Sequence, residues 1–329
     1  MRQLGVRRIG IHLDRSGLNP FSDLKLLTVY RMLLKRLRPA AYLGYTIKPN
    51  IYGSIAAASL KIPAIPNVSG LGTTFMGSGP LRWIAILMYR FAFRRAAVVF
   101  FQNPEDMQLF VDLRIIESDR ARLVPGSGID LAQFQQVPLP LSAPVFLLIG
   151  RLLRDKGVVE FVAAARLVRE EFPDARFQLL GPIDERNRSA IRAAELHSWI
   201  EEGSVEYLGA TDDVRPYIAA ASVIVLPSYR EGLPRSLLEG AAMGRPLIAA
   251  DVAGCREVVE DGVNGYLCAP RDKAALARAM RNMAALQVDE RAAMGQSGRR
   301  RVQERFSERF VIDAYLEALA ELASARQLI

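Results

Sequence analysis

The chain has 329 residues, of which half are hydrophobic and about a quarter are charged, so it is long enough for two globular domains. No apolar run reaches the ~18 residues that a membrane span needs, and the first residues lack the hydrophobic stretch of a signal peptide. Two cysteines, Cys255 and Cys268, are too few for a disulfide framework or a cysteine-bound metal, which favours a cytoplasmic protein.

The net charge of +8 is unevenly distributed. Residues 1–140 hold 18 Lys and Arg against 8 Asp and Glu, whereas residues 141–329 hold 25 against 27. A basic first half is expected to face nucleic acid, an anionic membrane or a substrate that carries a diphosphate. Because the chain has no helix-turn-helix pattern, RNA-recognition aromatics or zinc-ligand spacing, nucleic acid is not expected as a partner.

Apolar spacing predicts alternating strands and helices along the first half of the chain. The predicted strands lie at residues 8–13, 41–46, 63–68, 97–102 and 121–125. The predicted helices lie at residues 21–37, 51–60, 80–95 and 104–113. Alternation at this spacing is typical of an α/β fold with a doubly wound parallel sheet.

Two loops of this half follow a predicted strand and open a predicted helix, at residues 46–53 and 67–74. Both are expected at the carboxyl edge of the sheet, where such sheets bind ligands. Lys48, Asn50 and Ser69, with the amides near Gly70 and Gly72, could therefore contact the diphosphate or sugar of an acceptor. Ordinary turn chemistry, in which glycine and proline serve the backbone, explains the same residues equally well.

The predicted helix at residues 80–95 is apolar and aromatic and ends in arginines. Such a stripe could lie in a membrane interface with its arginines towards anionic headgroups. Core packing with a basic helix end is the commoner role of such a stripe.

The second half begins after residues 133–144, whose three prolines predict a semi-rigid linker. Buried strands are predicted at residues 145–149, 176–180, 205–209, 221–226 and 247–250. Arg151 and Lys156 lie five apart in the loop after the first of these strands, so together they could hold two phosphates. For Arg154 and Asp155 in the same loop, surface salt bridges are expected instead.

Two other charged segments of this half are expected to be structural. Thr211 or Asp212 is predicted to cap the helix that follows, which is commoner for adjacent acids at a helix start than metal binding. The arginines at 299–301 are predicted to form a solvated helical face.

The stretch at residues 227–244 combines a helix start with two carboxylates. Pro234 predicts a helix that ends before Gly244, and the free amides at its start favour an anion. Glu231 precedes these amides and Glu239 lies about one turn inside the helix. A phosphate with a carboxylate on each side for hydroxyls is what a sugar nucleotide needs, although two acids at this spacing are by themselves more often solvated surface charges.

Glu231 and Glu239 also match the Glu-x7-Glu signature of retaining glycosyltransferases of family 4, which have the GT-B fold. The segments 228–235, 249–259 and 261–265 resemble the branch of this family that builds bacterial cell-surface polysaccharides. The resemblance covers nearly the whole chain.

The resemblance implies two Rossmann-like domains that face a cleft. An acceptor-side domain is expected at residues 1–136, a linker at 137–144, a donor-binding domain at 145–307, and a C-terminal helix that returns towards the first domain at 308–329. Compared with the family, the chain begins at the third strand. We therefore expect an incomplete first domain without the first two strand–helix units, which are roughly 60 residues long.

The resemblance also implies roles for individual residues. It assigns Arg151 and Lys156 to the leaving diphosphate, Glu231 to the transferred sugar and Glu239 to the ribose. Further donor contacts are implied at Gly150, Gly181, Leu208, Gly232, Leu233, Arg235, Ser236 and Leu237. Many relatives carry a histidine where this chain has Thr46 or Ser69, so no catalytic histidine is assigned; His12 and His197 are expected to be structural.

The implied function is metal-independent transfer of a hexosyl or N-acetylhexosaminyl group from a UDP-sugar to a saccharide, with retention and without a cofactor. The basic first half favours an acceptor linked to polyprenyl diphosphate and peripheral contact with an anionic membrane, on the inner face of the cell membrane. Two alternatives stay open: a non-catalytic UDP-sugar-binding protein, and an enzyme similar to UDP-sugar 2-epimerases.

Overall fold

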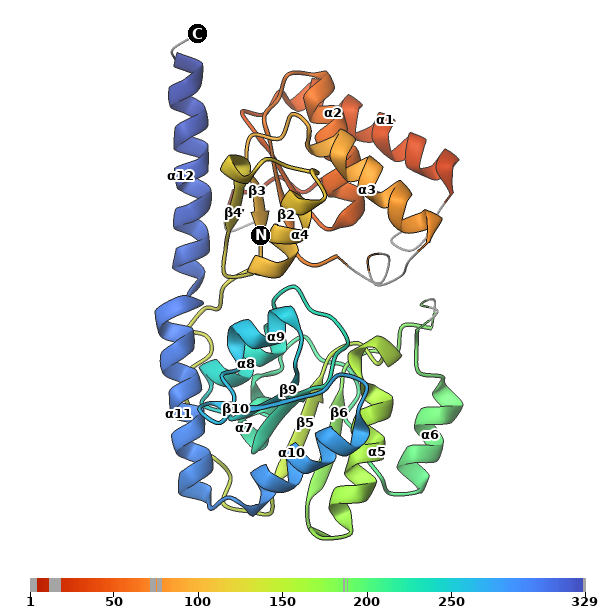
Figure 1. The fold of residues 1–329 in the computed structure, drawn as a ribbon, viewed down its shortest axis with the longest axis vertical. Helices are drawn as coiled ribbons and strands as arrows, with labels where there is room; N and C mark the ends of the chain where they lie inside the picture. Colours follow the sequence, from red (N-terminus) through yellow and green to blue (C-terminus); the bar gives the residue numbers. More distant parts are fainter. Residues whose placement is uncertain are drawn as a thin grey trace. The chain divides into compact units, whose positions relative to one another are not determined.

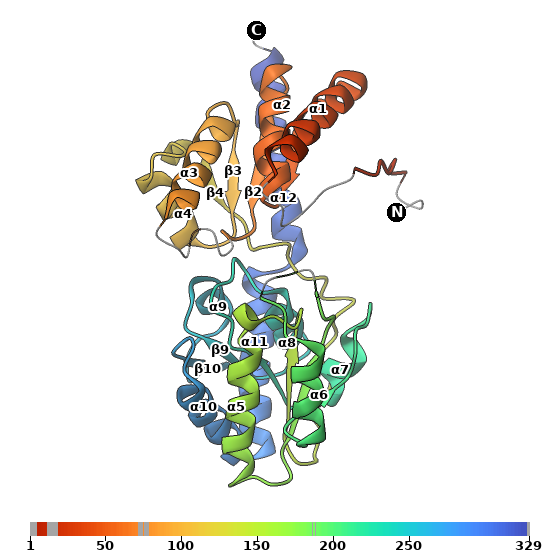
Figure 2. The same ribbon diagram turned by 90° about the vertical axis from the view of Figure 1, so that its right-hand side faces the viewer.

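The computed structural model describes residues 5–11, 19–71, 75, 79–185, 187 and 189–327 (Figures 1 and 2). The chain forms two compact units. The first comprises Met1–Phe101, Met107–Arg122 and Ala318–Ile329, and the second comprises Gln102–Asp106 and Leu123–Glu317. Residues 123–144, which include the predicted linker at 137–144, cluster with the second unit.

The first unit contains a parallel sheet with a simple strand order. Its strands follow one another as β1-β2-β3-β4, and β1–β2 and β2–β3 pair in parallel. The elements, in chain order, are α1 (Pro20–Leu37), β1 (Tyr42–Tyr45), the π-helix η2 (Pro49–Gly53), α2 (Ser54–Ser59), β2 (Ala64–Val68), α3 (Pro80–Phe93), β3 (Val99–Phe101), α4 (Pro104–Asp112), η4 (Ser118–Arg120) and β4 (Ala121–Leu123).

Most predicted elements of this unit are confirmed, with one exception. Residues 8–11 of the strand predicted at 8–13 form no strand, and residues 12–13, with His12, lie outside the described residues. All of residues 6–10 are exposed. The alternation of apolar and polar residues there has no core to pack against, so it does not produce a strand.

Aromatic packing on one side of α3 builds the core of the first unit. Tyr89 and Phe93 of α3 contact Phe110 of α4, with ring centroids 5.2 and 6.2 Å apart, and Phe101 of β3 lies 5.2 Å from the same ring. All four side chains are buried. One face of α3 is therefore committed to the interior.

The second unit is a six-stranded sheet in which every recorded pairing is parallel, in the order β10-β9-β8-β5-β6-β7. Its elements are β5 (Val145–Ile149), η5 (Arg154–Lys156), α5 (Val158–Arg169), β6 (Arg176–Leu180), α6 (Ala193–Glu201), β7 (Glu206–Tyr207), α7 (Arg215–Ala220), β8 (Val223–Leu226), α8 (Arg235–Ala242), β9 (Leu247–Ala250), α9 (Ala253–Val258), β10 (Gly265–Cys268), α10 (Lys273–Ala285) and α11 (Val288–Arg305). The last helix, α12 (Glu308–Gln327), begins in this unit, and its residues from Ala318 onwards belong to the first unit.

Alternate residues of the central strand β5 enter two separate cores. Phe146 and Leu148 pack with α5, α6 and α10, whereas Leu147 and Ile149 pack with α7, α8, α9 and α11 (Figures 1 and 2). Because both faces are covered, the strand is apolar along its whole length, as a buried parallel strand requires. The strand order reverses between β5 and β8, so this sheet is doubly wound, as the resemblance to the GT-B fold implies; the described strands of the first unit show no such reversal.

The arginine run on α11 departs from the predicted solvated face. Arg299 donates hydrogen bonds to the carbonyls of Phe134 and Ala242, both at 2.6 Å, and Arg301 donates to the carbonyl of Glu257 at 3.0 Å. Burial lowers the pKa of both guanidinium groups. These arginines satisfy main-chain oxygens that would otherwise lack a donor, and only Arg300 between them is exposed.

Among the described residues, no helix combines the length and the apolar character that crossing a bilayer requires.

Candidate functional site

The predicted donor residues gather at one edge of the second sheet. Because the paired strands run in parallel, the loops after β5, β6, β7 and β8 all leave from their carboxyl ends. The loops after β5 and β8 adjoin the reversal in strand order, which is where sheets of this kind form ligand sites. Arg151 and Lys156 follow β5, Gly181 follows β6, and Glu231 follows β8.

The two loops at the reversal are joined to each other. The carbonyl of Asp155 accepts hydrogen bonds from the Tyr229 amide at 2.9 Å and from the Ser228 Oγ at 3.1 Å. The Tyr229 hydroxyl donates to Glu160 Oε1 at 2.7 Å, and burial followed by this hydrogen bond raises the pKa of Tyr229. These contacts fix the position of Lys156, the next residue after Asp155.

Gly157 allows the two loops to approach so closely. Its φ of +73° lies in the left-handed region, and a Cβ there would be 2.1 Å from the Pro227 carbonyl oxygen. Any other residue would meet both backbone strain and a clash with main chain.

Lys156 and Glu231, which are 75 residues apart, form an ion pair across the joined loops. Both side chains are largely buried, and fully buried Cys255 lies close enough to sense both charges. Burial and then Glu231 raise the pKa of the Cys255 thiol, with Lys156 opposing them. The structure thus brings together two of the residues that the sequence marked for chemistry.

The start of α8 is open, as predicted. Pro234 is its N-cap, and among the described residues no side chain accepts a hydrogen bond from the first amides of the helix, at Arg235, Ser236 and Leu237. Glu239 lies one turn further along and is buried, while its Oε1 accepts a hydrogen bond from Arg235 Nε at 2.7 Å. Burial raises the pKa of Glu239, and Arg235 counteracts this effect.

Arg151 is the more exposed of the two predicted cations. Its Nη1 lies 3.1 Å from Asp184 Oδ2 in an exposed ion pair. In the same loop Arg154 binds Glu195 at 2.5 Å, which confirms the predicted surface salt bridge for that residue.

Gly150 and Gly181 lie side by side at the ends of β5 and β6. Gly181 has a φ of +146°, and a Cβ there would lie 1.9 Å from the Gly150 carbonyl oxygen. The amides of Gly181 and Leu208 donate to main-chain carbonyls of Gly209 and Leu179, at 2.8 and 2.9 Å. These two N–H groups are therefore already engaged within the sheet.

The turn at Glu231 and Gly232 rests on α9. A Cβ at Gly254 would lie 2.2 Å from the Gly232 carbonyl oxygen and 2.8 Å from that of Glu231. Leu233, beyond the turn, packs its side chain against the core beneath α8.

Sequence reasoning missed the supporting role of four residues here: Gly157, Ser228, Tyr229 and Gly254. Gly157 had a usable signal, since a glycine between a short turn and a helix often takes a positive φ. The pairing of Ser228 and Tyr229 with a loop about 73 residues away has no such local signal.

The acceptor-side residues predicted in the first unit have internal partners. Lys48 Nζ lies 2.7 Å from Asp23 Oδ1, and Tyr52 donates to the same carboxylate at 2.8 Å. Asn50 is buried and its Nδ2 donates to the Asn67 carbonyl at 2.7 Å. For Lys48 and Asn50 these contacts favour the structural alternative, in which polar side chains hold the loops together.

Ser69, Gly70 and Gly72 are the other residues of these loops that the sequence predicts to contact an acceptor. Ser69 is exposed, and Gly70 has a φ of +128°, a conformation that glycine adopts most readily. Gly72 lies outside the described residues.

The acids at 212–213 form a local cap. Asp213 Oδ1 accepts the Arg215 amide at 3.1 Å and also binds the Arg215 side chain, so the prediction that Thr211 or Asp212 caps α7 is wrong by one or two residues. Thr211 instead caps the Asp213 amide. The described residues contain no cluster of three His, Cys, Asp or Glu side chains suited to a metal ion.

Two protein families match the chain in sequence. Residues 143–285 match the family described as "Glycosyl transferases group 1", and residues 1–126 match the "Glycosyl transferase 4-like domain". Over 283 residues the chain is 30% identical to the N,N'-diacetylbacillosaminyl-diphospho-undecaprenol alpha-1,3-N-acetylgalactosaminyltransferase of Campylobacter jejuni, covering 80% of this chain and 73% of that protein. It is 31% identical to the lipopolysaccharide core biosynthesis glycosyltransferase LpsE of Rhizobium meliloti, over 63% of this chain and 54% of that one.

Solved structures share the fold at lower identity. Sucrose-phosphate synthase of Thermosynechococcus elongatus superposes with a TM-score of 0.74 at 22% identity, over 93% of this chain and 77% of that one. Anabaena HepE in complex with UDP-glucose superposes with a TM-score of 0.73 at 20% identity, over 94% and 84%.

Proposed function

We propose that this chain is a retaining transferase that uses a UDP-sugar. The chain belongs to the glycosyltransferase family 4-like enzymes with the GT-B fold. Its acceptor would be a saccharide linked to polyprenyl diphosphate, in surface polysaccharide biosynthesis. The observation that carries the proposal is the Lys156–Glu231 pair beside the open start of α8, at the reversal in strand order. The expected GT-B fold itself is confirmed by the two parallel α/β units and their structural relatives.

The Lys156–Glu231 pair supports a mechanism in which both side chains exchange each other for groups of the donor when the donor binds. Without a ligand, each charge neutralises the other in a largely buried place. When the donor diphosphate arrives, the Lys156 ammonium can turn to a phosphate oxygen, since it has three donors. Glu231 is then free to accept hydrogen bonds from hydroxyls of the transferred sugar, so neither state leaves a charged side chain without hydrogen-bond partners.

The start of α8 supports the rest of the nucleotide contact. Amides at Arg235, Ser236 and Leu237 point their dipoles at the space before the helix, where a diphosphate oxygen gains both hydrogen bonds and the helix field. Glu239 would exchange the Arg235 side chain for the ribose hydroxyls. Arg235 is exposed, so it can leave without the loss of a buried ion pair.

These groups account for the chemistry that we propose. The anomeric C–O bond to UDP breaks while negative charge grows on the leaving phosphate, and Lys156, Arg151 and the α8 amides stabilise that charge. The acceptor oxygen bonds to the anomeric carbon on the same face, and its proton passes to the departing phosphate oxygen. No carboxylate nucleophile is needed in this route, because the acceptor oxygen attacks the anomeric carbon directly.

The proposal of a polyprenyl-diphosphate-linked acceptor is supported by two observations of different kinds. The Campylobacter relative carries a diphospho-undecaprenol saccharide in its name, and the first half of this chain is basic. A diphosphate on the acceptor would be attracted to such a surface.

The proposal is tested by incubating the protein with UDP-glucose, UDP-galactose or their N-acetylated forms and a polyprenyl-diphosphate saccharide, then assigning the new anomeric bond by NMR. An α-linked product from an α-linked donor supports retention, and an inverted product overturns it. UDP binding without turnover would identify the non-catalytic alternative, and an epimerised donor without acceptor the epimerase-like one.

The ribose assignment has its own test. Glu239→Ala is expected to weaken UDP binding about 10-fold by calorimetry, because a charge-assisted hydrogen bond pair is lost. Equal UDP affinity in wild type and variant would remove Glu239 from the site.

A further inference from the structure

Helix α3 is apolar on two opposite faces. Its inner face, with Tyr89 and Phe93, packs into the core of the first unit. Its outer face exposes Trp83, Leu87 and Phe91 at 64%, 58% and 66% of their surfaces, and Ile84 lies beside them. A helix on the surface of a soluble domain is normally polar on its outer face, so packing within this unit does not explain the outer one.

The stretch of sequence that contains α3 is strongly basic. Between Leu24 and Pro104 the sequence contains eleven Lys and Arg and no Asp or Glu. Arg94 and Arg95 follow the last turn of α3 and are exposed, while Arg90 donates to the Leu113 carbonyl at 2.6 Å. An exposed apolar strip followed by exposed arginines is the composition of an interfacial helix.

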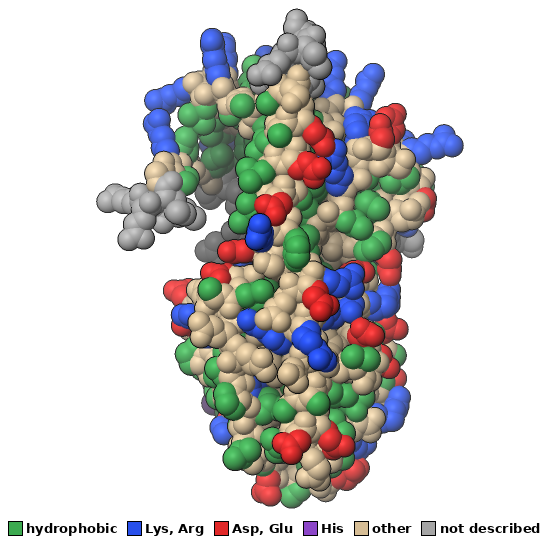
Figure 3. All heavy atoms as spheres, turned by 90° about the vertical axis from the view of Figure 1, so that its left-hand side faces the viewer, with side chains coloured by type: hydrophobic (Ala, Val, Ile, Leu, Met, Phe, Trp, Pro, Cys, Tyr) green, Lys and Arg blue, Asp and Glu red, His purple; other side chains and the backbone are tan. Residues whose placement is uncertain are grey.

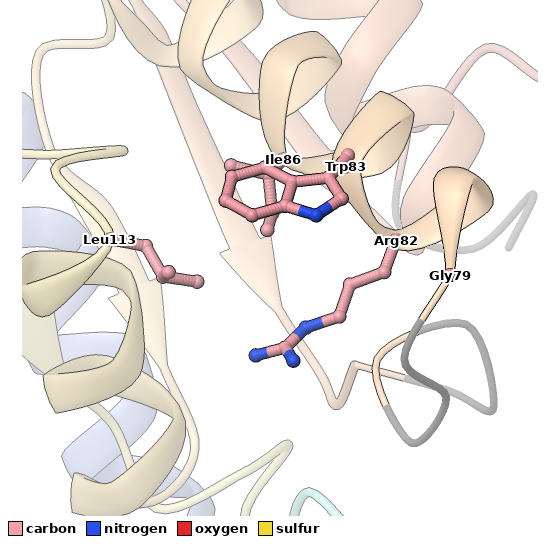
Figure 4. A pocket seen from close by; sticks show the side chains of 5 residues that line it. All are labelled: Gly79, Arg82, Trp83, Ile86 and Leu113. Atoms are coloured by element: carbon pink, nitrogen blue, oxygen red, sulfur yellow. The ribbon is translucent and has the colours of Figure 1, made fainter.

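A small cavity adds a cation at the other end of the strip. It has a volume of about 160 Å³ and is lined by Gly79, Arg82, Trp83, Ile86 and Leu113 (Figure 4). The Nε of Arg82 is buried there without a hydrogen-bond partner among the described residues. The side chains of Arg82 and Trp83 both come from the first turn of α3, so a guanidinium adjoins the exposed indole.

We propose that the outer face of α3 docks on an anionic phospholipid bilayer. Trp83, Leu87 and Phe91 enter the boundary between headgroups and acyl chains, and Arg94 and Arg95 bind lipid phosphates. Charge decides for this occupant over a second copy of the chain, because pairing two such faces would bring like charges together. The inference does not depend on the proposed function, since it needs neither donor nor acceptor.

Helix α12 provides a contrast within the same protein. Ile312 and Leu316 are also exposed and apolar, but Asp313 and Glu317 lie beside them, and acidic side chains accompany apolar ones along the face seen in Figure 3. An anionic surface would repel these carboxylates. Exposure of apolar side chains alone therefore does not distinguish the two helices; the charge beside them does.

The apolar part of the proposal is tested by co-sedimentation of the full chain with vesicles of 30% phosphatidylglycerol in phosphatidylcholine, without any acceptor. Wild type is expected to bind, and Leu87→Gln/Phe91→Gln is expected to bind about 10-fold more weakly or worse. The matched control Ile312→Gln/Leu316→Gln is expected to bind as wild type does. Wild type that stays in solution, or a control that weakens equally, overturns the proposal.

The basic part has a separate test. Arg94→Gln/Arg95→Gln is expected to lose several-fold in affinity for these vesicles, and the loss should shrink as salt rises. Lys273→Gln/Arg278→Gln removes the same charge from exposed positions of α10 and is expected to have little effect. Equal loss in both variants would indicate attraction by net charge and overturn a role for α3.

Two further measurements make the outcome unambiguous. Thermal unfolding should be the same in all four variants and wild type, which shows that the substituted units are folded and requires no donor. Light scattering checks for self-association: a dimer in wild type that disappears in Leu87→Gln/Phe91→Gln would assign the face to a second copy and overturn the lipid proposal.

Discussion

The two sheets of this protein differ in one respect that decides what their loops do. In the second unit the strand order reverses between β5 and β8, and the loops after these strands converge. In the first unit the described strands follow in simple order, β1 to β4, without a reversal. Polar residues that look alike in sequence are therefore used differently: those of the second unit surround an open helix start, and Lys48 and Asn50 of the first hold their own loops together.

Two lysines make the comparison concrete. Lys156 pairs with Glu231 and Lys48 pairs with Asp23, and in both pairs the side chains are no more than 25% exposed. By burial and partner type the two pairs are nearly equivalent. Only the position of Lys156 at the strand reversal assigns it a ligand.

The largest expected effect follows from removing that lysine. Lys156→Met should lower turnover about 10²- to 10³-fold, because charge growing on the leaving phosphate loses its nearest cation. Arg154→Met, which removes a cation from the same loop but from an outward pair with Glu195, should change turnover less than about 2-fold. Steady-state kinetics with a UDP-sugar measure both, and equal losses would place the phosphates elsewhere.

The next effect concerns stability of the second unit. Arg245 is fully buried and donates to the carbonyls of Val137, Pro138 and Ala221. Burial lowers its pKa to about 10, so it is still charged at neutral pH. Arg245→Met should reduce the free energy of unfolding by about 3 kcal/mol, since three carbonyls lose a donor.

Urea denaturation measures this loss, and Arg245→Lys, which can serve fewer carbonyls, should be intermediate. A variant as stable as wild type would show that the predicted linker at residues 137–144 is not held by Arg245.

A smaller effect is expected from Glu239→Gln, and its sign depends on pH. Burial raises the pKa of Glu239 in the folded protein, so folding is opposed by ionisation once the pH exceeds the ordinary carboxyl value. At neutral pH the variant should be as stable as wild type or up to about 1 kcal/mol more stable. As the pH falls through the raised pKa towards the ordinary value of 4.5, wild type should recover this difference.

Thermal unfolding of both proteins between neutral pH and pH ~4.5 measures that difference. A variant that is less stable at neutral pH, with the gap narrowing on acidification, would mean that Arg235 outweighs burial.

The smallest effect is expected in the first unit. Lys48→Met should reduce the free energy of unfolding by about 1 kcal/mol, because Tyr52 still donates a hydrogen bond to Asp23 after the pair with Lys48 is lost. UDP affinity should not change. A loss of UDP affinity in Lys48→Met would remove the distinction between the two units.

Where one face or both faces of an element are buried, the sequence predicts it well. The strands at 145–149, 176–180 and 247–250 were predicted to the residue, because burial on both sides demands a continuous apolar run. The start of α8 follows from the fixed backbone of Pro234. These are local requirements that a single segment of sequence can express.

Partners far apart in the chain could not be predicted. Lys156 has the acid Asp155 beside it in sequence, yet its partner is Glu231, 75 residues away, because Tyr229 and Ser228 bring that loop in. Likewise the arginines at 299–301 look like surface charges until the fold brings carbonyls of Phe134 and Glu257 within reach. Which charges a fold satisfies depends on tertiary contacts that no spacing encodes.

The ion pair between Lys156 and Glu231 also bears on how strongly salt affects nucleotide binding at this site. An open cluster of cations collects dissolved anions, which must leave before a nucleotide can enter, and its affinity then drops steeply with added salt. Here the counter-charge is a side chain that stays on the protein throughout. Titrations of UDP at several potassium chloride concentrations should therefore show that the UDP affinity decreases only slightly with salt. The protein would then bind the nucleotide with similar affinity over a wide range of ionic strength.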